Sequence, residues 1–165
     1  MLVRALAPAL ALALLALPSP LWAAGRGEGF GVWETRTLGC RRNLAGSPVI
    51  PCFGVLLEQR LEGLLNVAFM ARAPEPGASN QLMFVGQLQP GSAAMACRLG
   101  RCEPKGPFTL ALSSVSETRF DGRGLAQGLP KTWLVQGTCS LEARNLICQA
   151  RALSGEQWRA STKTL

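Results

Sequence analysis

The sequence of 165 residues contains no histidine and no tyrosine. Histidine is the most common general base in enzymes, so its absence excludes serine–histidine and cysteine–histidine nucleophile systems. A serine–lysine arrangement is not indicated either, because Lys105, Lys131 and Lys163 all lack a serine three positions earlier. We therefore predict that the protein is not an enzyme.

Glycoside hydrolysis is the one catalytic chemistry that the acidic residues still allow, because a glycosidase needs only two carboxyl groups. The candidates are spread along the chain without a diagnostic spacing: Glu34, Glu58, Glu62, Glu117 and Asp121. The stretch from Glu117 to Gly124 combines charges of both signs with glycines, as an anion-binding loop does. An Asp-Gly turn explains that stretch more simply, so we assign it no catalytic role.

Neither a metal centre nor a redox centre is predicted. A zinc site needs four thiolates in two close pairs, or histidine in place of some of them. Cys97 and Cys102 are separated by four residues, whereas a thioredoxin-type centre has two residues between its cysteines. We expect no cofactor and no metal, and we expect all six cysteines to form disulfides.

No hydrophobic run is as long as the roughly 20 residues of a membrane-spanning helix. The longest one, Ala5–Leu17, follows the charged Arg4 and is followed by Pro18 and by small residues near Ala23. This order of charged, apolar and small residues is typical of a cleavable signal peptide. The alternative is an uncleaved membrane anchor, for which the apolar run is too short.

We therefore predict a signal peptide at residues 1–23 and a single disulfide-stabilised, β-rich domain at residues 24–165, with no transmembrane span after cleavage. Export to the periplasm or the cell exterior agrees with the six cysteines, because disulfides persist in oxidising compartments. A mature chain of this length forms one domain.

The charge balance is basic, with 17 Lys and Arg against 10 Asp and Glu. Such a balance favours an anionic envelope component or an acidic protein as a partner. The basic residues are scattered and do not alternate with aromatic residues as they do in nucleic-acid grooves. We therefore expect no specific binding of nucleic acid.

Cys139 and Cys148 indicate a β-hairpin that turns at residues 142–145. The register that places these cysteines opposite each other also collects apolar residues on one face: Trp133, Val135, Gly137, Cys139, Leu141, Leu146, Cys148, Ala150 and Ala152. Polar residues occupy the other face, apart from Leu134, Ile147 and Leu153. Sorting with a period of two is typical of a half-buried antiparallel hairpin, and a third strand is predicted over residues 156–162.

Upstream, short runs rich in β-formers at residues 31–38, 82–88, 95–97 and 108–115 alternate with Gly- and Pro-rich turns. The fold class predicted is mainly β, as a small antiparallel barrel or sandwich with three disulfides. Residues 53–71 are read as a hairpin that turns at Glu62-Gly63. The alternative is a short helix within residues 54–71, because Leu57, Leu61, Leu64, Leu65 and Ala68 also follow a helical stripe.

Six cysteines allow 15 connectivities, and we pair sequence neighbours: Cys40 with Cys52, Cys97 with Cys102, and Cys139 with Cys148. Two arginines, Arg98 and Arg101, lie on the small ring closed by the second pair. Burial of both charges without partners would cost several kcal/mol. We therefore predict that they project into solvent and act as surface contact residues.

An export signal, a tryptophan near the mature start, an early cysteine pair and a close later pair form the layout of the chain. This layout is similar to that of the invasion-associated locus B family of secreted β proteins. The additional pair at Cys139 and Cys148 departs from that layout, so no function is transferred.

Two functions of different classes are expected from these observations. The first is a non-catalytic binding module of the periplasm or cell exterior, which uses its basic surface or a barrel mouth. The second is an inhibitor of a secreted hydrolase, in which the Cys97–Cys102 loop enters an active-site cleft. A rigid disulfide loop suits that role because it loses little freedom on binding.

Overall fold

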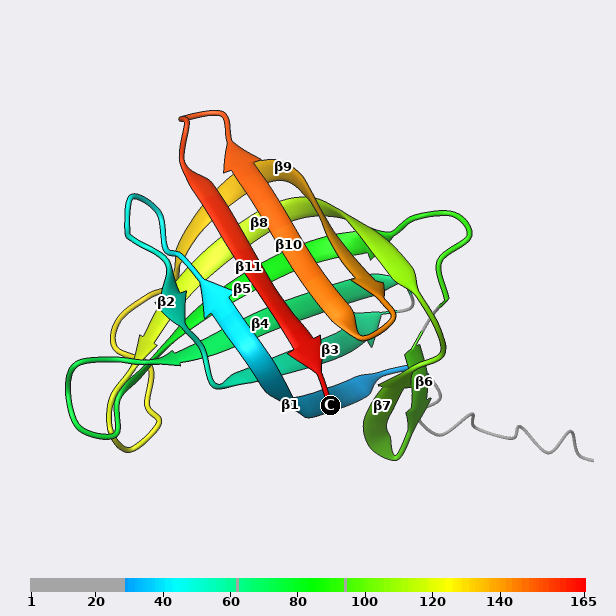
Figure 1. Ribbon diagram of the computed structural model, residues 1–165, viewed down its shortest axis with the longest axis horizontal. Helices are drawn as coiled ribbons and strands as arrows, with labels where there is room; N and C mark the ends of the chain where they lie inside the picture. The colour runs from blue at the N-terminus through cyan, green and yellow to red at the C-terminus, as the bar shows by residue number, and fades with distance from the viewer. Residues whose placement is uncertain (1–28, 62, 94) are drawn as a thin grey trace, which may run out of the picture.

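The computed structural model describes residues 29–61, 63–93 and 95–165. The predicted signal peptide, residues 1–23, lies outside the described residues. Eleven strands follow one another along the chain (Figure 1): β1 (Gly31–Arg42), β2 (Ile50–Pro51), β3 (Gly54–Leu61), β4 (Leu64–Arg72), β5 (Ser79–Leu88), β6 (Met95–Arg98), β7 (Gly100–Pro104), β8 (Phe108–Phe120), β9 (Lys131–Glu142), β10 (Asn145–Ala152) and β11 (Gln157–Thr164). The described part of the chain contains no helix, and so no apolar helix of membrane-spanning length.

Eight strands form a closed antiparallel barrel in the order β1-β3-β4-β5-β8-β9-β10-β11. The barrel closes because β11 pairs with the second half of β1, from Thr37 opposite Thr164 to Arg42 opposite Ala160. Closure removes the free sheet edges that an open sandwich would leave. The predicted β class is confirmed, and of its two architectures the structure has the barrel.

The hairpin predicted from Cys139 and Cys148 is confirmed. Strands β9 and β10 pair in the predicted register, with the two cysteines opposite each other, and β11 continues the sheet. The apolar face points into the barrel, while Leu134 and Leu153 are 80% and 96% exposed. These two leucines and Ile147, which is 45% exposed, were the exceptions in the sequence pattern, and the structure places all three on the outer face.

Residues 53–71 form the hairpin of β3 and β4, and the helix considered within residues 54–71 is wrong. A helical stripe would bury Leu61, which is instead 64% exposed. Side chains alternate with the period of a strand, so that Leu57 and Leu65 face the core. Gly63 makes the tight turn with a φ of 78°, a conformation that glycine adopts without strain.

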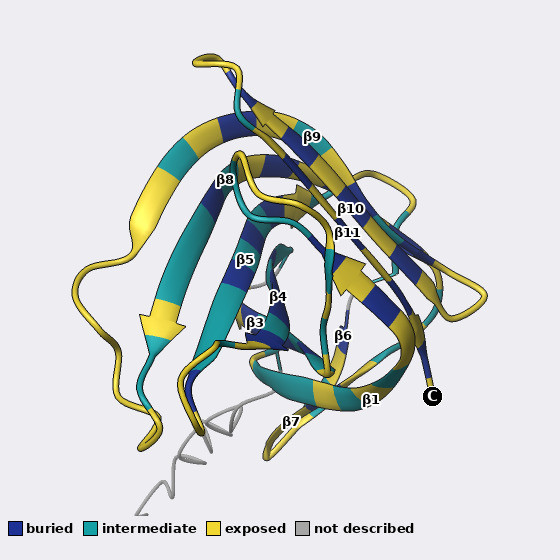
Figure 2. Ribbon diagram, turned by 60° about the vertical axis from the view of Figure 1, so that its left-hand side comes forward, coloured by how far each residue is buried: buried dark blue, intermediate teal, exposed yellow. Residues whose placement is uncertain are grey.

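Large apolar side chains fill the interior of the barrel. The buried residues alternate along the strands with exposed ones (Figure 2). Phe69 and Phe84 contact each other edge to face with ring centroids 6.0 Å apart. Toward the β10–β11 turn, Trp133 and Trp158 pack at 5.1 Å. Eight-stranded barrels are just wide enough for side chains to fill them, and burial of these large groups is the main stabilising term.

Two elements lie outside the barrel. Strand β2 pairs with the end of β1, and the hairpin of β6 and β7 projects from the opposite end of the molecule (Figure 1). Strand β7 runs parallel to the start of β1, with Gly31 opposite Gly100 and Val32 opposite Arg101. The hairpin is therefore attached to the barrel at one strand.

Candidate functional site

The β6–β7 hairpin carries both arginines that the sequence singles out. Its turn is made by Leu99 and Gly100, with φ values of 52° and 78°, and the Cys97–Cys102 disulfide closes it. Arg98 and Arg101 occupy directly opposite register positions and are exposed. Like charges opposite each other on a hairpin repel, so an anion placed between them would stabilise the pair.

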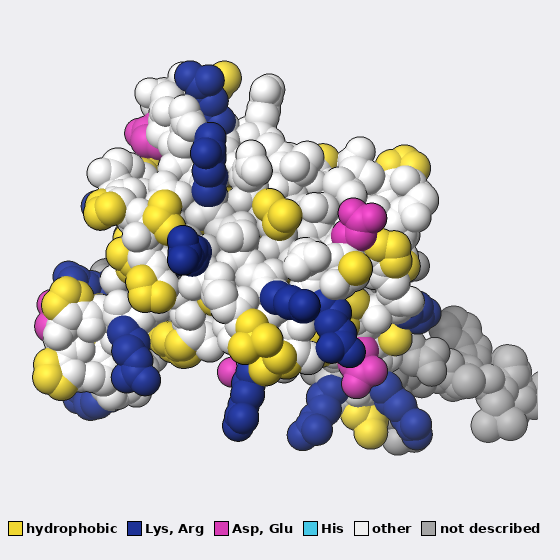
Figure 3. Space-filling model, viewed as in Figure 1, with side chains coloured by type: hydrophobic (Ala, Val, Ile, Leu, Met, Phe, Trp, Pro, Cys, Tyr) yellow, Lys and Arg dark blue, Asp and Glu magenta, His cyan; other side chains and the backbone are white. Residues whose placement is uncertain are grey.

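A cleft of 1010 Å³ lies between this hairpin and the first half of β1. Three basic side chains line it, Arg98, Arg101 and Lys105, together with the acidic Glu34 and Glu103. Figure 3 shows Lys and Arg side chains projecting around the hairpin, with an acidic side chain among them. The lining therefore carries three basic groups against two acidic ones.

The remaining wall of the cleft provides an aromatic surface and a buried amide. Trp33 on β1 is half-buried, and Gln59 on β3 is almost fully buried. The Gln59 side-chain amide donates to the Gly29 carbonyl, while its Oε1 has no partner among the described residues. That oxygen can accept a hydrogen bond from a ligand or from water.

Sequence patterns do not predict this combination of residues. Arg98 and Arg101 were found because a disulfide ring displays them, but Trp33, Gln59 and Lys105 carry no such signal. Trp33 and Gln59 meet the hairpin only because β7 pairs with the start of β1, which lies about 70 residues earlier in the chain. A parallel contact over that separation leaves no periodic trace in the sequence.

Two of the candidate carboxylates, Glu58 and Glu117, make hydrogen bonds or ion pairs within the structure. Glu58 pairs with Arg60 at 2.9 Å and accepts a hydrogen bond from Asn66, and Glu34 is exposed on β1. Glu117 accepts hydrogen bonds from Trp158 Nε1 and from the Ala45 backbone, both at 2.8 Å. Glu62 lies outside the described residues.

The Asp-Gly turn expected after Glu117 is present. Asp121 Oδ1 accepts backbone hydrogen bonds from Leu125 and Arg123, each at 2.9 Å. The Leu125 amide contributes most to lowering the pKa of this carboxyl below its ordinary value, and Arg123 adds to the effect. These hydrogen bonds stabilise the turn. The described residues contain no group of three potential metal-ligating side chains.

Comparison with protein-family models, with curated proteins and with solved structures finds no match to this chain. The resemblance to the invasion-associated locus B family therefore has no support beyond the layout of the residues. The function has to be inferred from the cleft and the charges that line it.

Proposed function

We propose that the protein is an exported, non-catalytic binding module that takes an anionic ligand in the cleft between β1 and the β6–β7 hairpin. The ligand is an anionic component of the cell envelope. The observation that carries the proposal is the position of Arg98 and Arg101 on the wall of the 1010 Å³ cleft. An acidic protein presents the same chemistry and is distinguished by the experiment below.

Rigidity of the hairpin supports a binding role. The disulfide and the two-residue turn hold Arg98 and Arg101 in place before any ligand arrives. A group that is already ordered loses less conformational freedom on binding, which raises the affinity. Trp33 adds a flat apolar surface beside the charges, as binding sites often do.

Export is part of the proposal. Three disulfides, Cys40–Cys52, Cys97–Cys102 and Cys139–Cys148, are formed. They are compatible with an oxidising environment. The predicted signal peptide at residues 1–23 supports the more specific location, the periplasm or the cell exterior.

Affinity capture tests the nature of the ligand. The mature protein, immobilised with its disulfides intact, is exposed separately to solubilised envelope material and to the culture medium. Recovery of a polyanionic envelope component supports the proposal. Recovery of an acidic protein alone would move the function to the second partner class, and recovery of nothing from either source would contradict it.

The double variant R98A/R101A tests the site. Each exposed ion pair contributes about 0.2–1 kcal/mol, so loss of two pairs weakens binding by about twofold to thirtyfold. The effect is largest at low salt, where screening is weakest. The melting temperature stays nearly unchanged because both side chains are exposed.

A matched control is R151A/R159A, which removes two exposed arginines from the outer faces of β10 and β11. We expect this variant to bind as the wild type does, because neither residue lines the cleft. Equal loss of affinity in the two double variants would mean that net charge, and not the cleft, controls binding.

The alternative function, inhibition of a secreted hydrolase by the Cys97–Cys102 loop, stays a prediction. Exposure of Leu99, at 83%, favours access to a cleft in a partner. Leu99 and Gly100 both have positive φ, whereas a peptide that occupies a protease as a substrate does is extended. An inhibitor of this shape would therefore block the active site without being read as a substrate.

A further inference from the structure

The connection between β8 and β9, residues 121–130, presents large apolar side chains to solvent. Residues 122–130 are all exposed, with Leu125 at 56% and Leu129 at 93%. Connections of this kind are normally polar, and apolar groups exposed on them add nothing to the core. Two exposed leucines on one connection therefore point to a partner outside the chain.

Hydrogen bonds hold the backbone of this connection in place. The Asp121 amide donates to the Leu125 carbonyl at 2.9 Å, and the Gln127 amide donates to the Arg119 carbonyl at 2.8 Å. Each exposed leucine directly follows a glycine with positive φ, at which the chain turns: Gly124 at 80° and Gly128 at 79°. The leucines are thus displayed on an ordered backbone, which lowers the entropy cost of binding.

Basic side chains flank the apolar part of the connection. Residues 124–130, Gly-Leu-Ala-Gln-Gly-Leu-Pro, carry no charge and lie between Arg123 and Lys131, which are both exposed. Arg123 pairs with Asp121 at 3.1 Å, whereas Lys131 forms no ion pair among the described residues. Glu117 is opposite Lys131 in the register, but it accepts a hydrogen bond from a buried indole at 2.8 Å. The Lys131 charge is therefore free to meet an anion.

The β4–β5 connection, residues 73–78, extends this surface. Gly77 packs against Gly122 so closely that a Cβ on Gly77 would lie 3.1 Å from the Gly122 Cα, and Glu75 pairs with Arg119 at 3.3 Å. The two connections lie together at one end of the barrel (Figure 1), where Figure 3 shows apolar and basic side chains side by side. Their charged residues, with those at the adjoining strand ends, are four basic and two acidic: Arg72, Arg119, Arg123 and Lys131, and Glu75 and Asp121.

We propose that this end of the barrel binds the surface of an anionic lipid membrane. Leu125 and Leu129 insert among the headgroups, and the flanking basic side chains meet lipid phosphates. Burial of apolar surface and attraction to anionic lipids together drive binding at such an interface. The core of a protein–protein interface is depleted of charged residues, whereas Arg123 and Lys131 flank the leucines directly, which favours lipid over a protein partner.

This surface is separate from the cleft at the β6–β7 hairpin, which lies at the opposite end of the molecule (Figure 1). The inference therefore does not depend on the function proposed for that cleft. A protein bound to a membrane in this way would present the cleft away from the lipid.

Co-sedimentation of the mature protein with lipid vesicles tests the proposal. We expect saturable binding to vesicles of phosphatidylcholine mixed with phosphatidylglycerol, and weaker binding as the salt concentration rises. Vesicles of phosphatidylcholine alone should bind at least tenfold more weakly, because they carry no net charge. Spin-labelled lipid should broaden the NMR signals of amides in residues 123–131. Absence of binding to the mixed vesicles at low salt, or broadening confined to other surfaces, would overturn the proposal.

The double variant L125S/L129S tests the leucines. It should bind the mixed vesicles at least tenfold more weakly, because burial of these side chains drives insertion. Its melting temperature should stay nearly unchanged, because both residues are exposed. The matched control is L61S/L99S, which removes leucines that are 64% and 83% exposed at the opposite end of the barrel. This control should bind as the wild type does, and equal losses in the two double variants would refute the site.

Charge variants separate this surface from net charge and from the cleft. K131Q should bind the mixed vesicles about fivefold more weakly, whereas K163Q, which removes an exposed lysine near the end of β11, should bind normally. R98A/R101A should keep its vesicle binding. Loss of that binding in R98A/R101A, with binding kept in L125S/L129S, would assign the lipid to the cleft and refute the proposal. A dimer that L125S/L129S dissociates in sedimentation velocity, without vesicle binding by the wild type, would make the loop a contact between copies and also refute it.

Discussion

At the scale of single residues, the polar groups inside the barrel connect its strands to the loops at one end. Glu117 on β8 is the clearest example, because one carboxylate oxygen accepts from Trp158 on β11 and from Ala45 in the β1–β2 connection. The Trp158 side chain is fully buried. A buried N–H without an acceptor costs about 1–3 kcal/mol, so Glu117 stabilises both segments.

We predict that E117A lowers the free energy of unfolding by about 2–4 kcal/mol, because it leaves two donors unsatisfied. E117Q keeps an acceptor oxygen and is expected to cost about half as much. Denaturant unfolding followed by tryptophan fluorescence measures both. E142A, at an exposed position in the β9–β10 turn, serves as the control and changes stability by less than about 0.5 kcal/mol. Equal stability of E117A and E142A would show that water replaces the carboxylate.

At the scale of elements, the two disulfide hairpins differ in how much of their placement in the fold their sequences predict. For β9 and β10, pairing and facing follow from residues within 20 positions of one another, and the structure confirms them. The β6–β7 pairing is equally local, and Cys97 is opposite Cys102 as expected. The position of that hairpin against β1, which creates the cleft, is not local at all.

The attachment of the hairpin depends on Gly31. A Cβ built at this position would lie 2.5 Å from the carbonyl carbon of Gly100, closer than packed atoms approach. We predict that G31A separates β7 from β1 and lowers stability by about 1–3 kcal/mol, the usual range for overpacking. Faster hydrogen exchange at the amides of β7 would report the separation.

Gly106 provides the matched control, because a Cβ there would meet only the Ala93 side chain at an ordinary 3.5 Å. G106A should leave hydrogen exchange in β7 unchanged. If G31A also left exchange and ligand affinity unchanged, the cleft would not depend on the β1–β7 contact.

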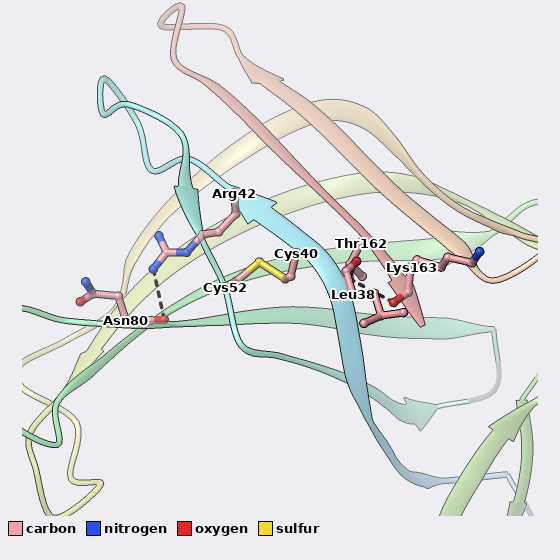
Figure 4. Close-up of a disulfide and its surroundings, with 7 residues drawn as sticks. All are labelled: Leu38, Cys40, Arg42, Cys52, Asn80, Thr162 and Lys163. Carbon is pink, nitrogen blue, oxygen red and sulfur yellow. Dashed lines mark hydrogen bonds between the residues drawn. A yellow bond between two sulfur atoms is a disulfide. The ribbon is translucent and has the colours of Figure 1, made fainter. Parts of the chain in front are cut away.

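At the scale of the whole molecule, each of the three disulfides joins residues that are close in the sequence. Hydrogen bonds between distant strands close the barrel. The disulfide-bonded cysteines are 12, 5 and 9 residues apart. Closure itself joins β1 to β11, more than 110 residues later, through backbone pairing and side-chain hydrogen bonds such as that from Thr162 Oγ1 to the Leu38 carbonyl (Figure 4), and without a disulfide. The disulfides therefore stabilise single hairpins and connections, and the interior packing holds the two ends of the sheet together.

Reduction should lower the melting temperature sharply. Each short ring contributes on the order of 2–3 kcal/mol, and three such contributions approach the net stability of an ordinary domain. Thermal unfolding followed by circular dichroism, with and without reductant and with alkylation of free thiols, measures the effect. The oxidised protein should give a β-rich spectrum with little helix. An unchanged melting temperature after complete reduction would show that interior packing suffices.

The sequence by itself determined the properties that depend on near neighbours. These are the β class, the pairing of cysteines, the inner and outer faces of β9 and β10, and the exposure of the ring that carries Arg98 and Arg101. A period of two and short loop closures are visible in a single chain, so these features could be predicted. The hairpin at residues 53–71 was harder to predict, because its leucines fit both the helical and the strand period. Only the exposure of Leu61 in the structure distinguishes the two.

Only the tertiary structure decided between a barrel and a sandwich, because both have the same local pattern and differ in whether β11 returns to β1. It also decided where charges gather. Arg42 is buried because barrel closure surrounds the end of β1, and Lys105 lines a cleft because β7 pairs with β1. Contacts between residues so far apart follow from the packing of the whole chain, and no local pattern records them.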